Sequence, residues 1–93
     1  MLEIDKSEKT IRIWEAKRVS LSVDNLRQLF FYYRNIKNHC PEFSDYDIEC
    51  ILIIASSTEP TQQYDDELLM LQTVMPGFNP TIRRFSEFGI HPS

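Results

Sequence analysis

Ile11–Tyr33 reads IRIWEAKRVSLSVDNLRQLFFYY and joins two different periodic patterns. Its first part alternates β-branched and polar side chains, which predicts a β-strand over residues 10–17. Its second part repeats apolar side chains at spacings of three and four, which predicts a helix over residues 23–37. One face of the strand carries Ile11, Ile13, Glu15 and Lys17. The apolar stripe of the helix consists of Leu26, Leu29, Phe30, Tyr33 and Ile36.

The residues on either side of this stretch predict two further strands. Residues 1–5 alternate weakly and are followed by the polar residues 6–9, so they form a hairpin with the strand over residues 10–17. Pro41 ends the helix. Residues 49–55 read ECILIIA, and such a nearly continuous apolar run is typical of a central strand buried on both faces.

The last third of the chain predicts another helix and a short strand. The helix runs from Pro60 to Val74, with Ser57 or Thr58 as its cap, and Pro76-Gly77 ends it. Residues 81–85 form the possible last strand, and the tail over residues 86–93 is expected to be flexible. The order β-β-α-β-α-(β) indicates one α/β domain over residues 1–93, built on a small mixed sheet.

Charge and composition narrow the class of protein. The net charge is −4, but residues 1–40 carry eight basic and five acidic side chains, whereas residues 41–93 carry two basic and nine acidic ones. If the chain binds nucleic acid, residues 1–40 are therefore expected to contact the phosphate backbone. No apolar run reaches the roughly 18 residues of a membrane span, and residues 1–10 lack a signal core, which favours a cytoplasmic protein. Cys40 and Cys50 fit no zinc spacing, and we expect free thiols, with Cys50 in the core.

A carboxylate, an ammonium group, an amide and a phenol converge where the strand meets the helix. Glu15 and Lys17 are two residues apart on the strand, so their side chains share a face about 7 Å apart. Gln28 and Tyr32 are four residues apart on the helix and share a face too. This combination suits a metal site that handles phosphate. The alternative is an exposed ion pair at a strand end, with Gln28 as an ordinary surface amide.

These residues resemble the PD-(D/E)xK nuclease superfamily. Glu15-Ala16-Lys17 matches its (D/E)xK element at the end of a hairpin strand, and Gln28 with Tyr32 matches the QxxxY element of RecB-type nucleases. The run WEAKRVSLSVDNLRQLFFYYRN is similar to the nuclease domain of type I restriction subunits. The resemblance covers residues 1–56. It implies the second half of a restriction-endonuclease-like core, and a DNA phosphodiesterase in a restriction, repair or defence setting.

The resemblance also implies a role for each matching residue. Glu15 would bind Mg²⁺ or Mn²⁺ as an oxygen ligand. Lys17 would help to deprotonate the attacking water and stabilise charge on the phosphate. Gln28 and Tyr32 would position these groups or the nucleic acid. The side chains that would contact DNA phosphates are Arg27, Arg34 and Lys37.

The first catalytic Asp of the family has no clear counterpart in this sequence. It belongs at the start of the preceding strand, beside the Glu of the (D/E)xK element. If Asp5 lies opposite Thr10, the position opposite Glu15 falls at or before residue 1. Glu3 then faces Arg12, and it can bind the metal only if the turn is shifted. We therefore expect a nuclease that is incomplete or impaired in this chain, either as a fragment or with the acid supplied by a second chain.

Exposed aromatic residues and an edge strand point to a protein partner. Phe31 falls outside the apolar stripe of its helix, and Trp14 lies on the strand face opposite Ile13 and needs cover. The first strand lies at a sheet edge, where its unpaired backbone groups can pair with a strand of another chain. We expect a homodimer, or a missing protein partner at the first strand. The alternative functions are a non-enzymatic interaction module that keeps the nuclease-like fold, or a small regulatory or immunity protein.

Overall fold

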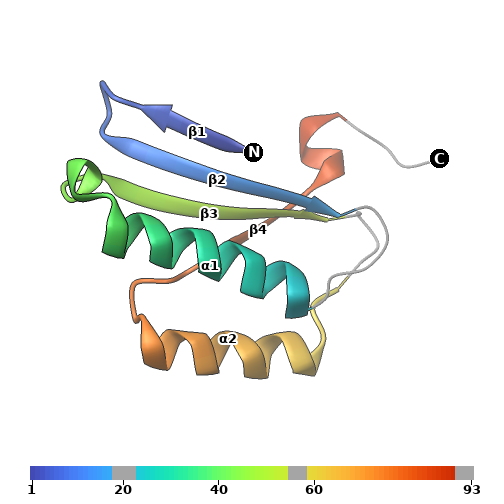
Figure 1. The fold of residues 1–93 in the computed structure, drawn as a ribbon. Coiled ribbons are helices and arrows are strands. Elements are labelled where there is room, and N and C mark those ends of the chain that lie inside the picture. The colour runs from blue at the N-terminus through green and yellow to red at the C-terminus, as the bar shows by residue number, and fades with distance from the viewer. Residues whose placement is uncertain (18–22, 55–58, 90–93) are drawn as a thin grey trace.

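The computed structural model of the chain describes residues 1–17, 23–54 and 59–89. Its elements follow the predicted order, with two short 3₁₀ helices added (Figure 1). They are β1 (Leu2–Asp5), β2 (Thr10–Lys17), α1 (Val23–His39), η1 (Pro41–Phe43), β3 (Asp47–Ile54), α2 (Gln62–Val74), β4 (Thr81–Arg84) and η2 (Phe85–Phe88). The prediction of a small α/β domain is confirmed.

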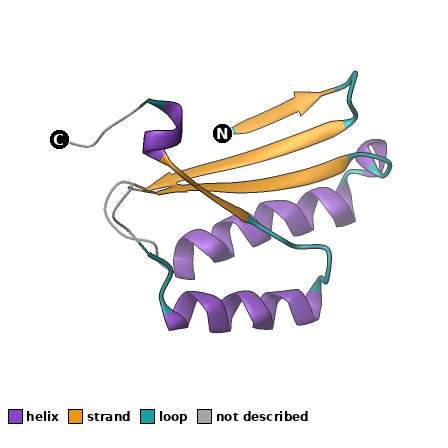
Figure 2. Cartoon of the chain, turned by 180° about the vertical axis from the view of Figure 1, so that it is seen from behind, coloured by secondary structure: helices purple, strands orange, loops and turns teal. Residues whose placement is uncertain are grey.

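The four strands form one mixed sheet in the order β1-β2-β3-β4. β1 is antiparallel to β2, whereas β2, β3 and β4 are mutually parallel. Both helices lie on one side of this sheet, and η2 lies on the other (Figure 2). Because β1 is at the edge and α1 lies over the central strands, the outer part of the hairpin has no helix above it.

The hairpin register is the expected one, and the turn explains it. Asp5 lies opposite Thr10, and Glu3 lies opposite Arg12. One carboxylate oxygen of Asp5 accepts hydrogen bonds from the Ser7 amide at 3.1 Å, the Ser7 hydroxyl at 2.7 Å and the Glu8 amide at 3.1 Å. These bonds, that of the Ser7 hydroxyl first, lower the pKa of Asp5. The carboxylate closes the turn and so fixes which residues of β1 and β2 are partners.

The core lies between the sheet and the helices. It contains Ile11 and Ile13 of β2, the predicted stripe of α1, and Cys50, Leu52 and Ile54 of β3. Phe78, which follows α2, is fully buried, and its ring contacts Phe30 and Tyr33 at centroid distances of 5.2 and 5.5 Å. The sequence analysis missed Phe78, because it lies in a connection rather than in a periodic element. Cys50 is buried, and both cysteines are free thiols, as predicted.

Two details differ from the sequence prediction. The N-cap of α2 is Thr61, whose hydroxyl accepts a hydrogen bond from the Tyr64 amide at 3.2 Å. The predicted cap candidates Ser57 and Thr58 lie outside the described residues. The tail begins with an ordered turn, η2, rather than a loose segment. Its Glu87 pairs with Arg83 at 3.0 Å, and its Phe88 ring packs edge-on against Trp14 at 6.4 Å.

Candidate functional site

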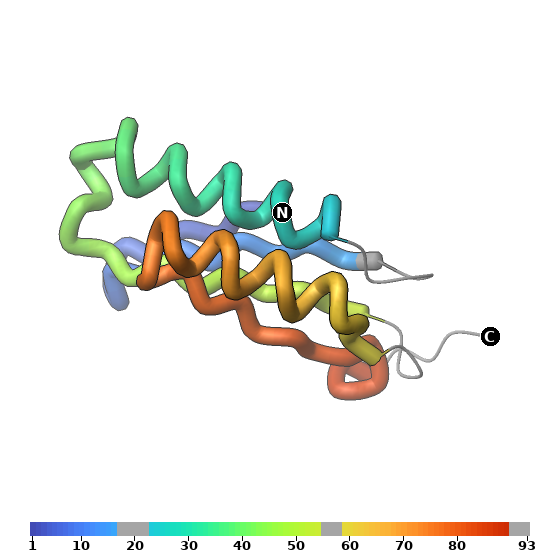
Figure 3. Tube along the Cα trace, turned by 90° about the horizontal axis from the view of Figure 1, so that it is seen from below, coloured from blue at the N-terminus to red at the C-terminus, as the bar shows by residue number. Residues whose placement is uncertain are grey.

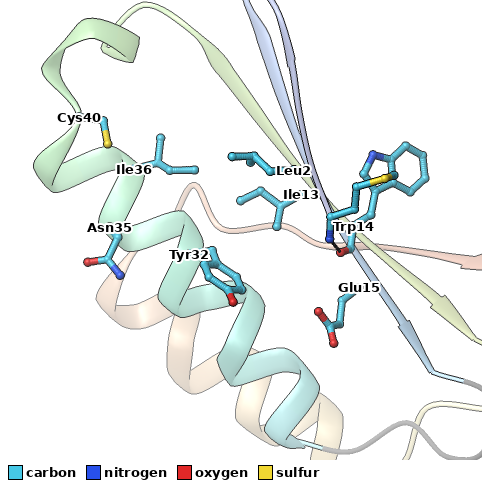
Figure 4. A pocket seen from close by; sticks show the side chains of 9 residues that line it. Leu2, Ile13, Trp14, Glu15, Tyr32, Asn35, Ile36 and Cys40 are labelled. Atoms are coloured by element: carbon cyan, nitrogen blue, oxygen red, sulfur yellow. Dashed lines mark hydrogen bonds between the residues drawn. The ribbon is translucent and has the colours of Figure 1, made fainter.

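A pocket of about 360 Å³ lies between the end of the β1–β2 hairpin and α1 (Figure 4). Its apolar wall includes Leu2, Ile13 and Ile36, and its polar lining includes Glu15, Tyr32 and Asn35. The alternation of β2 places Glu15 on the same side as the buried Ile11 and Ile13, toward α1. In Figure 4 the Glu15 carboxylate and the Tyr32 hydroxyl both point toward the gap between β2 and α1.

The pocket is open because of its place at the sheet edge. Tyr32 lies on the flank of α1, next to the buried stripe, and it is 44% exposed. Leu2 of the edge strand is 55% exposed for the same reason. Glu15 is half-buried near the end of β2, where the parallel strand β3 also ends. Crevices at the carboxyl ends of parallel strands are common ligand sites, so the position of Glu15 is suited to binding.

The predicted site residues separate into two groups. Glu15 and Tyr32 line the pocket together. Gln28 is exposed one turn before Tyr32 on the same flank of α1, but it does not line the pocket. The backbone of Lys17 pairs with Ile54 at the end of β2, and the side chain of Lys17 lies outside the described part of the chain.

The predicted phosphate-binding side chains do not gather at this pocket. Arg27 lies on the α2 side of α1, where its Nε is 2.7 Å from a carboxylate oxygen of Glu67. Arg34 is exposed and lies two turns after Arg27, hence on the same flank. The Lys37 ammonium lies 5.9 Å from the centre of the Tyr33 ring. These side chains therefore belong to the helical face of the molecule.

Glu3 does not join Glu15. It lies opposite Arg12 on the sheet face that points away from α1, and the two side chains approach to 3.5 Å. The same arginine is 3.0 Å from Glu49 on β3. In this register Glu3 points away from the pocket, and only a slip of the hairpin by an odd number of residues would turn it toward α1. The hydrogen bonds that Asp5 accepts in the turn oppose such a slip. The conditional assignment of Glu3 as a metal ligand is thus not supported.

Among the described residues that line the pocket, Glu15 supplies the one carboxylate, which is a poor fit to a divalent metal. The Met1 nitrogen donates to the Trp14 carbonyl at 2.8 Å, and the Trp14 amide donates to the Met1 carbonyl at 2.8 Å. Met1 is therefore the partner of Trp14, and no residue of β1 lies opposite Glu15. Across residues 1–17, 23–54 and 59–89, no three His, Cys, Asp or Glu side chains form a group that could hold a metal ion. Mg²⁺ bound by Glu15 alone would depend on water and substrate oxygens for its other ligands.

The sequence analysis missed Asn35 and Ile36 as pocket residues. Asn35 follows Tyr32 by three positions and Ile36 by four, so helical periodicity alone places them beside it. Cys40, which was expected only as a free thiol in a loop, also lines the pocket, where α1 ends.

No family model, curated protein or solved structure matches the chain. Of the helices in the described part of the chain, none has the length and apolar character needed to cross a bilayer. The assignment of function therefore depends on the site and on the motif.

Proposed function

We propose that the chain is a nuclease-related protein of the PD-(D/E)xK type, with half of a metal-dependent DNA phosphodiesterase site. The observation that carries the proposal is the shared pocket of Glu15 and Tyr32. Glu15 comes from the end of a hairpin strand, and Tyr32 comes from the QxxxY position of the following helix. An ExK triplet alone is weak support, and the shared pocket adds a spatial relation between its Glu and the Tyr of the following helix.

The topology supports the same proposal. A hairpin, a crossover helix and a parallel strand stand in the order that the motif requires. The β1 side of the pocket is open, so an extended polymer could reach Glu15 without displacing a helix. The approach of DNA would bring phosphate to a carboxylate, and this contact is unfavourable without a cation between them. For this reason we assign Mg²⁺ or Mn²⁺ as the cofactor of the completed site.

A second carboxylate beside Glu15 is what this half-site lacks. The residue opposite Glu15 in the antiparallel ladder would follow outward from the Met1–Trp14 pair, and its side chain would point toward α1. A carboxylate there, from an extension of β1 or from a second chain, would give the two acidic ligands that hold such ions. The chain by itself is therefore proposed to cleave DNA poorly or not at all.

The experiment compares the native chain with a chain extended by one aspartate directly before Met1, after a new initiating residue. An asparagine at the same added position serves as the matched control. Mn²⁺-dependent cleavage of labelled single- and double-stranded DNA is then measured. We expect cleavage by the aspartate-extended chain alone, and its loss with Glu15→Gln or Lys17→Ala. A folded aspartate-extended chain that does not cut DNA would contradict the proposal, as would cleavage that is unaffected by Glu15→Gln.

A non-enzymatic interaction module is the second candidate. The specific observation in its favour is that the pocket wall is mostly apolar, with Leu2, Ile13 and Ile36 beside a single carboxylate. Such a surface suits a side chain of a protein partner better than a phosphate. The extended chain separates the candidates, because an interaction module would not cleave DNA even with the added aspartate beside Glu15.

A further inference from the structure

The two helices that cover the sheet carry four large exposed apolar side chains, which we call the helical patch. It consists of Phe31 of α1 and Leu69, Met70 and Val74 of α2. Their exposed fractions are 61%, 66%, 58% and 63%. Phe31 lies on the outer side of α1, and its ring packs edge-on against the Tyr32 ring at a centroid distance of 6.1 Å. Figure 3 shows the two helices side by side and running in the same direction, so that together they form one surface.

A hollow adjoins the helical patch. It lies between the first halves of α1 and α2, has a volume of about 410 Å³, and is lined by Val23, Arg27, Gln63, Asp66, Glu67 and Met70. Met70 belongs both to the hollow and to the helical patch. Phe31 stands on α1 one turn beyond Arg27, so a projecting ring and a receiving hollow lie next to each other on the same surface.

We propose that this surface binds a second copy of the chain about a two-fold axis, with Phe31 of each copy in the hollow of the other. A two-fold interface is isologous, so it requires one patch to supply both halves of each contact. A projecting ring beside a hollow meets this requirement. This inference does not depend on the proposed nuclease function, although Phe31 contacts the Tyr32 ring at the edge of the pocket.

This surface also carries one basic and one acidic side chain that could pair across the two-fold axis. Arg34 lies beside Phe31, three positions later on α1, and forms no ion pair with any residue that the structure describes. Asp66 lines the hollow, where the Gln62 amide donates to it at 2.8 Å, and within the described residues it has no basic partner either. When Phe31 of one copy enters the hollow of the other, Arg34 is carried toward Asp66. The pair occurs twice in the dimer.

The size of the surface is sufficient for a dimer of modest stability. The molecule measures 42 × 30 × 14 Å along its principal axes, and the helices form one of its two broad faces. A standard interface buries about 800 Å² of accessible surface on each partner, and a face that extends 42 by 30 Å is broad enough to supply it. The four apolar side chains of the helical patch expose on the order of 400 Å² together, which is the range in which surface patches are often functional.

The edge strand β1 is the competing place for a second copy, and its charges oppose self-pairing. In any antiparallel pairing of β1 with itself, residues of the same sheet face lie opposite one another. Glu3 and Asp5 share the face away from α1, so carboxylates would meet carboxylates across the two-fold axis. Directly opposed like charges destabilise a strand pair. Charged edges of this kind protect a sheet from pairing with its own copies.

The test measures molar mass by sedimentation equilibrium over a protein concentration range that extends to the millimolar. We expect a concentration-dependent shift from the monomer to twice its mass, and at least a tenfold weaker association for Phe31→Ser. Phe31 is exposed, so this variant should fold, and circular dichroism checks that it does. Ile4→Lys, which replaces an exposed apolar residue on β1, is the matched control and should dimerise like the native chain.

A charge exchange tests the proposed geometry. Arg34→Glu and Asp66→Lys should each weaken the dimer, and the double variant should restore most of the association. A native chain that stays monomeric throughout the concentration range would overturn the proposal. So would a dimer that persists in Phe31→Ser, or one that Ile4→Lys abolishes, since the latter would place the contact on β1.

Discussion

Gly77→Ala tests the packing that sets the rotation of α1, and hence the direction of Tyr32. A Cβ atom at Gly77 would lie 2.6 Å from the Tyr33 hydroxyl oxygen, whereas ordinary contacts begin at 3.4 Å. The obstacle at Gly77 is steric and not conformational. Of the described glycines, Gly89 has a positive φ (76°), which favours glycine, whereas Gly77 does not. The substitution therefore measures how firmly the Tyr33 ring is held.

The cost can be estimated from the surroundings of Tyr33. The residue is 5% exposed, and its ring lies 5.5 Å from that of the fully buried Phe78. The rigid ring cannot withdraw from Gly77 without moving its neighbours, so the expected loss is that of an overpacked core, about 1–3 kcal/mol. For a domain of this size, each kcal/mol lowers the melting temperature by about 4–8 °C.

Tyr33→Phe provides the matched background. It removes the obstructing oxygen, and the next ring atom, Cζ, is 3.9 Å from the added Cβ. Within the described residues the hydroxyl makes no hydrogen bond, so Tyr33→Phe alone should cost little. Urea unfolding of the native chain, the two single variants and the double variant gives the coupling energy between positions 33 and 77. The reasoning would be refuted if Gly77→Ala were harmless in the native background, or equally damaging in both.

Three further predictions concern stability. Burial raises the pKa of Cys50 from 9.0 to about 12. Between these two pH values the thiol ionises in the unfolded chain but not in the folded one. The free energy of unfolding should therefore fall by about 1.4 kcal/mol per pH unit across this range. Cys50→Val should remove this part of the slope in urea titrations at pH 8 and above, whereas Cys40→Val should not. Arg27→Met leaves the buried Glu67 carboxylate without its 2.7 Å partner and should lower the melting temperature in thermal unfolding. Glu67→Leu in the same protein should recover part of the loss. Thr61→Ala removes the N-cap of α2 and should cost about 1 kcal/mol, while Thr73→Ala, at an exposed position late in the same helix, should cost less.

Local patterns in the sequence were enough to predict the architecture. The turn after Asp5 fixes the hairpin register, and the spacing of apolar residues gives α1 and its buried face. The isoleucine-rich run gives β3 as a central strand. Each of these depends on residues close together in the chain, where the periodicity of a strand or helix is a sufficient guide.

Contacts between distant segments were not predictable in the same way. Arg27 was expected at DNA phosphates, but it meets Glu67 forty positions later, because parallel packing of the two helices brings them together. Phe88 covers Trp14 from a tail with no periodic pattern. The pairing of Glu15 with Tyr32 in one pocket was anticipated because both lie within the β2–α1 unit, whose crossover geometry is restricted.

Mn²⁺ binding measured by electron paramagnetic resonance tests the central claim most directly. The claim is that Glu15 faces the position where a second metal-binding carboxylate would stand. The chain extended by an aspartate before Met1 should bind Mn²⁺ at least tenfold more tightly than the asparagine-extended control, and Glu15→Gln should abolish the difference. Equal affinities in the two extended chains, or a gain that survives Glu15→Gln, would contradict the assignment of this pocket as a nuclease half-site.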